Sequence, residues 1–174
     1  ICQSTSDSAV VIHLIAKSKQ PLFRDRVIEA LKQVEGSYCI LATDGHEIVA
    51  ARDPRGCRPL WLGSLDGGHV FASESCALDI IDAEWVREIN PGEVVVACDS
   101  GIKSLMPFEP VTPKKCIFEF VYLARPDSYL FGRSVDEVRK QLGRNLAKIA
   151  PVEADLVMSV PDSSNAAALG YSHE

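Results

Sequence analysis

The chain has 174 residues, of which 47% are hydrophobic and 24% charged, and its formal net charge is −6. This length is enough for one domain or two small ones, and the composition is ordinary for a globular protein. The negative charge, with no Lys- or Arg-rich run, argues against nucleic acid or an anionic membrane as a partner. No apolar stretch approaches the roughly 20 residues that span a bilayer.

The N-terminus and the cysteines bear on where the protein works. Residues 1–7 contain neither the basic nor the apolar region of a signal peptide, and without an initiator Met we expect the chain to begin inside a longer one. The six cysteines form no C-x-x-C pair, so we expect reduced thiols and a cytoplasmic location. Cys39 and Cys98 lie in apolar segments, where a cysteine behaves as a small buried hydrophobe.

The first part of the chain is predicted to form two helices. Hydroxyl and acidic residues at 4–8 offer N-caps to a helix over residues 9–16. In a second helix, apolar residues recur from Phe23 at intervals of four, four and three, and Gly36 ends it.

Short strands and turns follow as far as residue 107. Asp44-Gly45, between predicted strands at 37–43 and 46–52, is a strong hairpin signal. This spacing predicts an antiparallel meander, one face of which the two helices cover. The remaining predicted elements are strands at 59–63, 69–72, 85–89, 93–98 and 102–107, and a short helix at 76–82.

An apolar run at 117–124 separates two parts of the chain that have different patterns of predicted elements. Pro107, Pro110 and Pro113 precede it and indicate a linker, and an R-P-D-S sequence at 125–128 ends it abruptly. The run favours a largely buried strand, although so short a run also fits a helix. We interpret it as the seam between two domains.

After the seam the pattern becomes helix, strand, loop and helix. Ser134 and Glu137 have the form of a capping box for an amphipathic helix that ends before Pro151. A short buried strand is predicted at 155–160 and a helix start at 165–170. This order predicts the opening of a parallel α/β sheet.

Three places could carry chemistry. Asp7, at a helix start, would cap the helix or hold a ligand's ammonium group, and the cap is the more frequent role. The Arg- and Pro-rich block at 51–60 fits a rigid turn with a local Arg–Asp pair better than an anion site. Ser163 lies between a predicted strand and a helix, where it would cap the helix or face a ligand at the sheet edge.

Several short motifs, taken together, point to one family. Their combination resembles glutamine phosphoribosylpyrophosphate amidotransferase (amidophosphoribosyltransferase) from end to end. The second and fifth of them are the most specific. In chain order they are T-S-D-S at 5–8, A-R-D-P-x-G-x-R-P-L at 51–60, A-S-E-S at 72–75, P-G-E at 91–93, F-E-F-V-Y-L-A-R-P-D-S at 118–128 and V-P-D-S at 160–163.

The resemblance implies a fold that is α+β and then α/β. Residues 1–108 would be the C-terminal part of an N-terminal-nucleophile (αββα) glutaminase domain, residues 109–114 a linker, and residues 115–174 the start of a type I phosphoribosyltransferase domain. In this family, ammonia from glutamine displaces pyrophosphate from phosphoribosyl pyrophosphate, giving 5-phosphoribosylamine in the first committed step of purine synthesis. The parent enzyme would be a tetrameric glycosyltransferase that purine nucleotides inhibit.

The resemblance also assigns roles to three residues. Asp7 matches the aspartate that holds the α-amino group of glutamine. Ser163 matches a residue of the Mg²⁺ site beside the sugar pyrophosphate, where it would act with phosphate oxygens and acidic side chains. Cys116 matches the first of four cysteines that hold a [4Fe–4S] cluster in one branch of the family, although members of the cluster-free branch can also carry a cysteine here.

Other family features are absent from this sequence. The nucleophile is an N-terminal Cys, but the chain starts at Ile1, and Cys2 lies too close to the T-S-D-S motif to be that residue. The acidic phosphoribosyl pyrophosphate loop and the other cluster cysteines are missing too, so we expect an internal fragment without activity of its own. Two alternatives stay open: a non-catalytic glutamine- or nucleotide-binding module, or another class II glutamine amidotransferase, against which residues 116–170 argue.

Overall fold

The computed structural model describes residues 6–174, so Cys2 and the predicted capping residues before Ser6 lie outside the described part. Its helices and strands confirm a mixed α/β architecture. The chain divides into two compact units. One contains the segments up to Arg58 and from Ile89 to Lys114, and the other contains Pro59–Glu88 and Lys115–Glu174.

The first unit is built on a four-stranded antiparallel sheet in the order β1–β2–β6–β7. Consecutive residues of its two central strands are buried, and both edges of each are hydrogen-bonded; Val49 of β2, for example, pairs with Val96 of β6. Since β6 pairs with β2, the prediction of one continuous meander is wrong. The strands are β1 (Cys39–Thr43), β2 (Glu47–Arg52), β6 (Val94–Cys98) and β7 (Gly101–Leu105).

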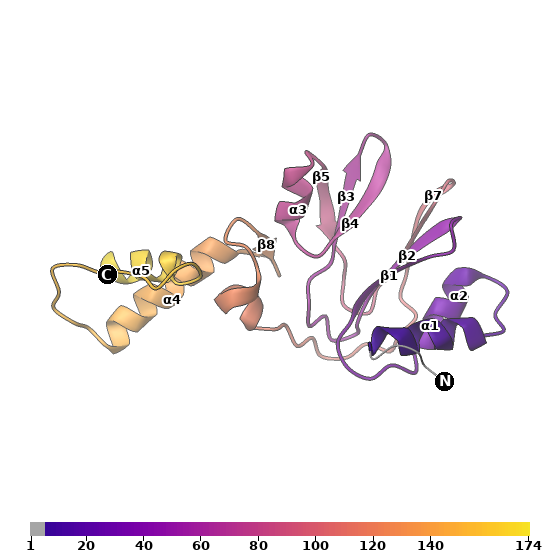
Figure 1. The fold of residues 1–174 in the computed structure, drawn as a ribbon, viewed down its shortest axis with the longest axis horizontal. Helices are drawn as coiled ribbons and strands as arrows, with labels where there is room; N and C mark the ends of the chain where they lie inside the picture. The colour runs from indigo at the N-terminus through magenta and orange to yellow at the C-terminus, as the bar shows by residue number, and fades with distance from the viewer. Residues whose placement is uncertain (1–5) are drawn as a thin grey trace. The chain divides into compact units, whose positions relative to one another are not determined.

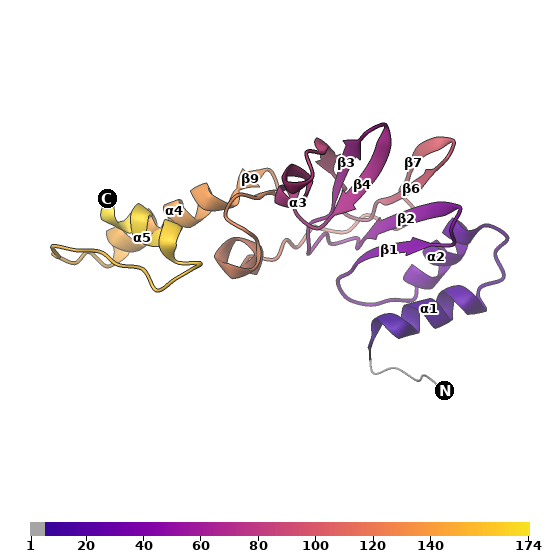
Figure 2. The same cartoon turned by 45° about the horizontal axis from the view of Figure 1, so that its top comes forward.

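Two helices pack against this sheet. Helices α1 (Ser8–Lys17) and α2 (Phe23–Leu31) lie side by side next to it, as Figures 1 and 2 show. Val27 and Leu31, four residues apart on α2, contribute to the same buried cluster as the valines of β2 and β6. Both predicted helices are confirmed, although α2 ends before the predicted Gly36.

The second unit begins with a three-stranded antiparallel sheet in the order β4–β3–β5. The β3–β4 turn consists of Asp66 and Gly67, both with positive φ (50° and 79°), the turn geometry that matches the twist of a hairpin. The elements here are β3 (Trp61–Leu65), β4 (Gly68–Ala72), α3 (Ser75–Ile80) and β5 (Glu84–Glu88).

Helices dominate the rest of the second unit. The Ser134 hydroxyl accepts a hydrogen bond from the Glu137 N–H at 3.3 Å, so the predicted N-cap is confirmed. The last two helices lie side by side (Figures 1 and 2). In chain order the elements are η1 (Glu119–Leu123), β8 (Tyr129–Leu130), β9 (Arg133–Ser134), α4 (Val135–Ile149) and α5 (Asn165–Ser172).

The apolar run at 117–124 is not the strand that its composition favoured. It contains a π-helix, and the buried Arg139 guanidinium donates to the carbonyl oxygens of Phe120 (2.6 Å) and Ala124 (2.8 Å). Carbonyls that a strand would pair with a neighbouring strand are therefore satisfied by a side chain.

The predicted seam also does not separate two cores. Phe120 and Ala124 belong to the same buried cluster as Trp61 and Leu78, which come from the three-stranded sheet and α3. The compact units therefore differ from the predicted segments 1–108 and 115–174, because the residues after the linker fill a core that earlier strands begin.

Two further expectations fail for lack of a covering partner. Residues 152–160 form no strand, and Leu156 and Val160 are 71% and 82% exposed, since the described residues supply no strand beside them. Cys39 is exposed on β1, at the edge of its sheet, and Cys98 is only half-buried.

None of the helices among residues 6–174 combines the length and hydrophobicity needed to cross a membrane.

Candidate functional site

The second unit contains a cavity of about 710 Å³ between the R-P-D-S turn, helix α4 and the loop before α5. It brings the predicted Ser163 next to residues that lie far from it in sequence. The polar and turn residues in its lining are Arg125, Pro126, Asp136, Arg139, Asp162 and Ser163.

Charged groups around this cavity are held in place by specific contacts. Arg125 forms an ion pair with Asp127 at 2.7 Å, and this hydrogen-bonded pairing lowers the pKa of the Asp127 carboxyl and raises that of the guanidinium. Asp136 pairs with Lys140, one helical turn further along α4, at 2.5 Å. Burial lowers the pKa of Arg139. The cavity thus has both basic and acidic walls.

Ser163 and Asp162 are the candidate magnesium ligands. Their hydroxyl and carboxylate oxygens are the donors Mg²⁺ prefers, and Mg²⁺ characteristically takes one or two protein ligands with phosphate oxygens and water completing the shell. Across residues 6–174, no group of three or more His, Cys, Asp or Glu side chains is arranged to hold a metal. The two residues therefore fit Mg²⁺ only as a site shared with a phosphate ligand.

Asp7 lies in the first unit, at the start of α1. It occupies the N-cap position that the sequence predicted, and its Oδ1 atom accepts the N–H of the first helical residue, Ser8, at 2.7 Å. The residue is exposed, and Oδ2 makes no hydrogen bond within the described chain. One carboxylate oxygen therefore caps the helix while the other can accept from a ligand's ammonium group.

Cys116 is half-buried and free. A [4Fe–4S] cluster needs four thiolates, and no such group is present in the part of the chain that is described. Cys116 alone therefore does not fit an iron–sulfur cluster.

The Arg- and Pro-rich block at 51–60 is a rigid turn. The buried Asp53 carboxylate accepts the N–H groups of Arg55 (2.9 Å) and Cys57 (3.2 Å). Arg52, equally buried, donates to the carbonyls of Gly56 and Ile89. These contacts to the backbone confirm the rigid turn, while the local Arg–Asp pair stays a prediction.

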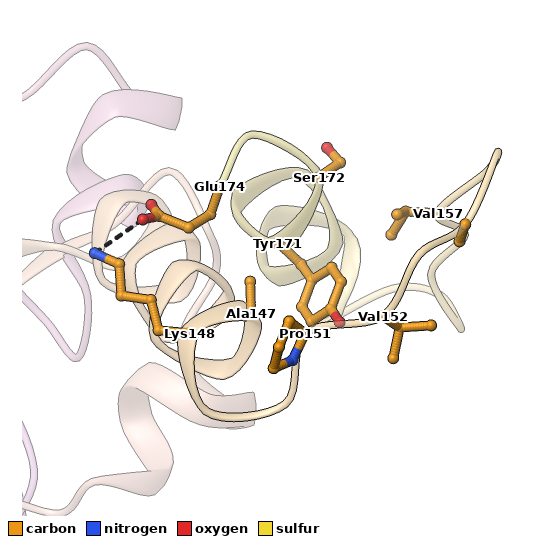
Figure 3. Close-up of a pocket in the computed structure, with 9 residues that line it drawn as sticks. Ala147, Lys148, Pro151, Val152, Val157, Tyr171, Ser172 and Glu174 are labelled. Atoms are coloured by element: carbon orange, nitrogen blue, oxygen red, sulfur yellow. Dashed lines mark ion pairs between the residues drawn. The ribbon is translucent and has the colours of Figure 1, made fainter.

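A second cavity, of about 460 Å³, is lined by the C-terminal ends of α4 and α5 and by the loop that follows α4 (Figure 3). Lys148 and Glu174 form an ion pair at 3.0 Å on its rim, and the Tyr171 hydroxyl donates to the Ala150 carbonyl at 2.7 Å. It contains none of the predicted site residues, so the first cavity is the stronger candidate.

Sequence reasoning missed several residues of the larger cavity. In the sequence, Arg125 is only part of a motif, and Asp136 and Arg139 are only polar positions of an amphipathic helix. The signal shared by Asp136 and Arg139 is their spacing of three residues, which places them on one face of α4. Nothing local indicated that this face meets the R-P-D-S turn.

Comparisons with known proteins agree with the family resemblance. A glutamine amidotransferase domain family matches residues 1–79. The amidophosphoribosyltransferase of Rhizobium etli is 49% identical over 180 residues, which cover all of this chain and 36% of that protein. The chloroplastic amidophosphoribosyltransferase of Vigna aconitifolia is 51% identical over 98% of this chain and 35% of that protein. The chain thus spans about a third of the length of these relatives.

A solved structure gives the same result. Glutamine phosphoribosylpyrophosphate amidotransferase from B. subtilis, complexed with ADP and GMP, has a TM-score of 0.96 and 40% identity to this chain. The match covers 99% of this chain and 38% of that one. The resemblance that the motifs indicated is confirmed.

Proposed function

We propose that this chain, which is similar along its whole length to amidophosphoribosyltransferases, functions as part of such an enzyme. The reaction splits glutamine to ammonia and glutamate. Ammonia then forms a bond to C1 of phosphoribosyl pyrophosphate as the bond to pyrophosphate breaks, which gives 5-phosphoribosylamine. The observation that carries the proposal is the cavity that joins Ser163 to the R-P-D-S turn, two motifs of the family.

In this proposal each unit contributes to a different substrate. Asp7 accepts from the α-ammonium group of glutamine through the oxygen that does not cap α1. Ser163 and Asp162 face the pyrophosphate, whose charge Mg²⁺ would neutralise when bound. Arg125, whose side chain is 57% exposed although it pairs with Asp127, is the cation of the lining that would meet an anion. Arg139 is buried and donates to backbone carbonyls.

We further infer that residues 115–174 open a phosphoribosyltransferase domain. Leu156, Val157, Met158 and Val160 form a nearly continuous run of exposed apolar side chains, typical of a strand that is buried on both faces of a parallel sheet. Leu146 and Ile149 of α4 are exposed as well, at 55% and 82%. A sheet formed with later parts of a full-length enzyme would bury both sets.

The test uses Ser163→Ala in the full-length protein, with ammonia as the nitrogen donor. Losing one contact to a charged group costs about 1.5–3 kcal/mol, so the KM for phosphoribosyl pyrophosphate should rise roughly 10- to 100-fold. Glutamine hydrolysis should keep its rate. Ser172→Ala, an exposed serine of α5 outside the cavity, is the control. An unchanged KM and Mg²⁺ response in Ser163→Ala would contradict the proposal.

A further inference from the structure

Glu74, at the start of α3, reaches a turn that lies more than fifty residues away in sequence. Its Oε2 atom accepts the backbone N–H of Arg125 at 2.8 Å and the Ser128 hydroxyl at 2.7 Å. One carboxylate oxygen therefore bridges the first and last residues of the R-P-D-S turn. Ser128 is 1% exposed, so its end of the contact is buried, whereas Glu74 is only half-buried.

Two neighbouring side chains extend the same attachment. The buried Ser75 hydroxyl accepts the Tyr129 N–H at 2.8 Å, and the Glu88 carboxylate at the end of β5 accepts the Phe131 N–H at 2.9 Å. Residues 125–131 are thus held by three acceptors from the segment 74–88. We call these four hydrogen bonds the clasp.

Helix α4 holds the same turn from its other side. The Asp136 N–H donates to the Pro126 carbonyl at 3.1 Å, and Arg139 donates to the Ala124 carbonyl at 2.8 Å. Within the turn, the Ser128 N–H donates to the Arg125 carbonyl at 3.1 Å. The turn is therefore hydrogen-bonded both to the segment 74–88 and to α4.

The clasped turn is also a wall of the candidate site. Arg125 and Pro126 line the 710 Å³ cavity with Ser163, whereas Glu74 does not line it. A change at Glu74 therefore reaches the cavity through the turn, and its charge also acts on the guanidinium groups of Arg125 and Arg139. Its negative charge matters because hydrogen bonds to a charged acceptor are roughly twice as strong as neutral ones.

We propose that Glu74 is a positioning residue, whose carboxylate sets the R-P-D-S turn so that Arg125 and Pro126 complete the cavity containing Ser163. The ligand class is that of the proposed function, an anionic sugar phosphate, and this part of the inference rests on that proposal. The clasp itself is independent of it.

The experiment compares Glu74→Gln with the parent in the full-length protein. Glutamine keeps the shape but loses the charge, so the KM for phosphoribosyl pyrophosphate should rise about tenfold. The kcat of glutamine hydrolysis measured alone should not change, and neither should Tm by more than a few degrees. Glu84→Gln is the matched control, because this exposed carboxylate contacts only the Ser64 hydroxyl, at 3.4 Å, among the residues described.

A double-mutant cycle separates positioning from general destabilisation. Ser128→Ala removes one donor of the clasp. The rise in the free-energy cost, measured from KM, should therefore be much smaller in the double mutant than the sum of the two single-mutant costs. Additive effects, or a Glu74→Gln protein with the parent's KM, would overturn the inference.

Hydrogen exchange provides a readout that does not depend on activity. In Glu74→Gln, the amides of residues 125–131 should exchange faster than in the parent, while those of β2 keep their protection. If the parent makes no phosphoribosylamine, the proposed function fails. Unchanged amide exchange at residues 125–131 in Glu74→Gln would contradict the positioning role of Glu74, whatever the activity measurements show.

Discussion

Cys76 and Cys39 differ in their surroundings and should differ in reactivity. Cys76 is buried on α3, and burial raises the pKa of its thiol, so little of the reactive thiolate forms near neutral pH. Cys39 is exposed. With iodoacetamide at pH 7.5, peptide mass spectrometry should find Cys39 modified at least tenfold faster than Cys76. Comparable rates in the folded protein, with the denatured protein as reference, would contradict the structure.

At the residue scale, local signals could be predicted and distant ones could not. The Ser134 cap was predictable because donor and acceptor lie three residues apart. For Asp7 the local sequence predicted a cap, and the family resemblance predicted a contact to the α-amino group of glutamine. The partners of Glu74 lie 51 and 54 residues further along the chain, so its motif could be seen but its role could not.

Helices α4 and α5 approach each other through two glycines. A Cβ on Gly143 would lie 1.9 Å from the Ala167 carbonyl oxygen, and one on Gly170 would lie 2.0 Å from that of Lys140. Gly→Ala within a helix normally stabilises by about 1 kcal/mol. Here the clash should reverse the sign, and each substitution should lower the free energy of unfolding by about 1–3 kcal/mol.

Chemical denaturation of the full-length protein measures this directly. Gln141→Ala is the control, since the residue is exposed on the same helix and alanine there should be neutral or slightly stabilising. A Gly143→Ala protein as stable as this control would show that the helices do not pack so closely.

At the element scale, the sequence predicted those helices and turns whose own residues show a regular apolar spacing or turn signal. The helices α2 and α4 and the hairpin turns follow from apolar spacing and turn residues. The run at 117–124 and the residues 155–160 have no such pattern. A short apolar run forms a strand only if another strand pairs with it, and the local sequence does not show whether one does. In one case Arg139 satisfies the backbone of a π-helix instead, and in the other no partner is present in the described chain.

At the scale of the whole molecule, the ordered motifs indicated the family, and the comparisons agree over the full length of the chain. The division into compact units was not predictable. It depends on Phe120, Ala124, Leu130 and Val135 filling the core beside Trp61, a long-range contact that no local pattern encodes. Domain boundaries drawn at prolines therefore missed a core that draws on both sides of the linker.

The central proposal, that Asp7 contacts the ammonium group of glutamine, is tested most directly by Asp7→Asn in the full-length protein. Asparagine caps helices as well as aspartate, so α1 should keep its stability while the charge facing the ammonium group is lost. The KM for glutamine should rise about tenfold or more, while ammonia-dependent formation of phosphoribosylamine stays near the parent rate.

The matched control is Asp25→Asn, which makes the same change in the first turn of α2. If Asp7→Asn leaves the KM for glutamine unchanged, or lowers the glutamine- and ammonia-dependent rates together, Asp7 is only a helix cap and the account is contradicted.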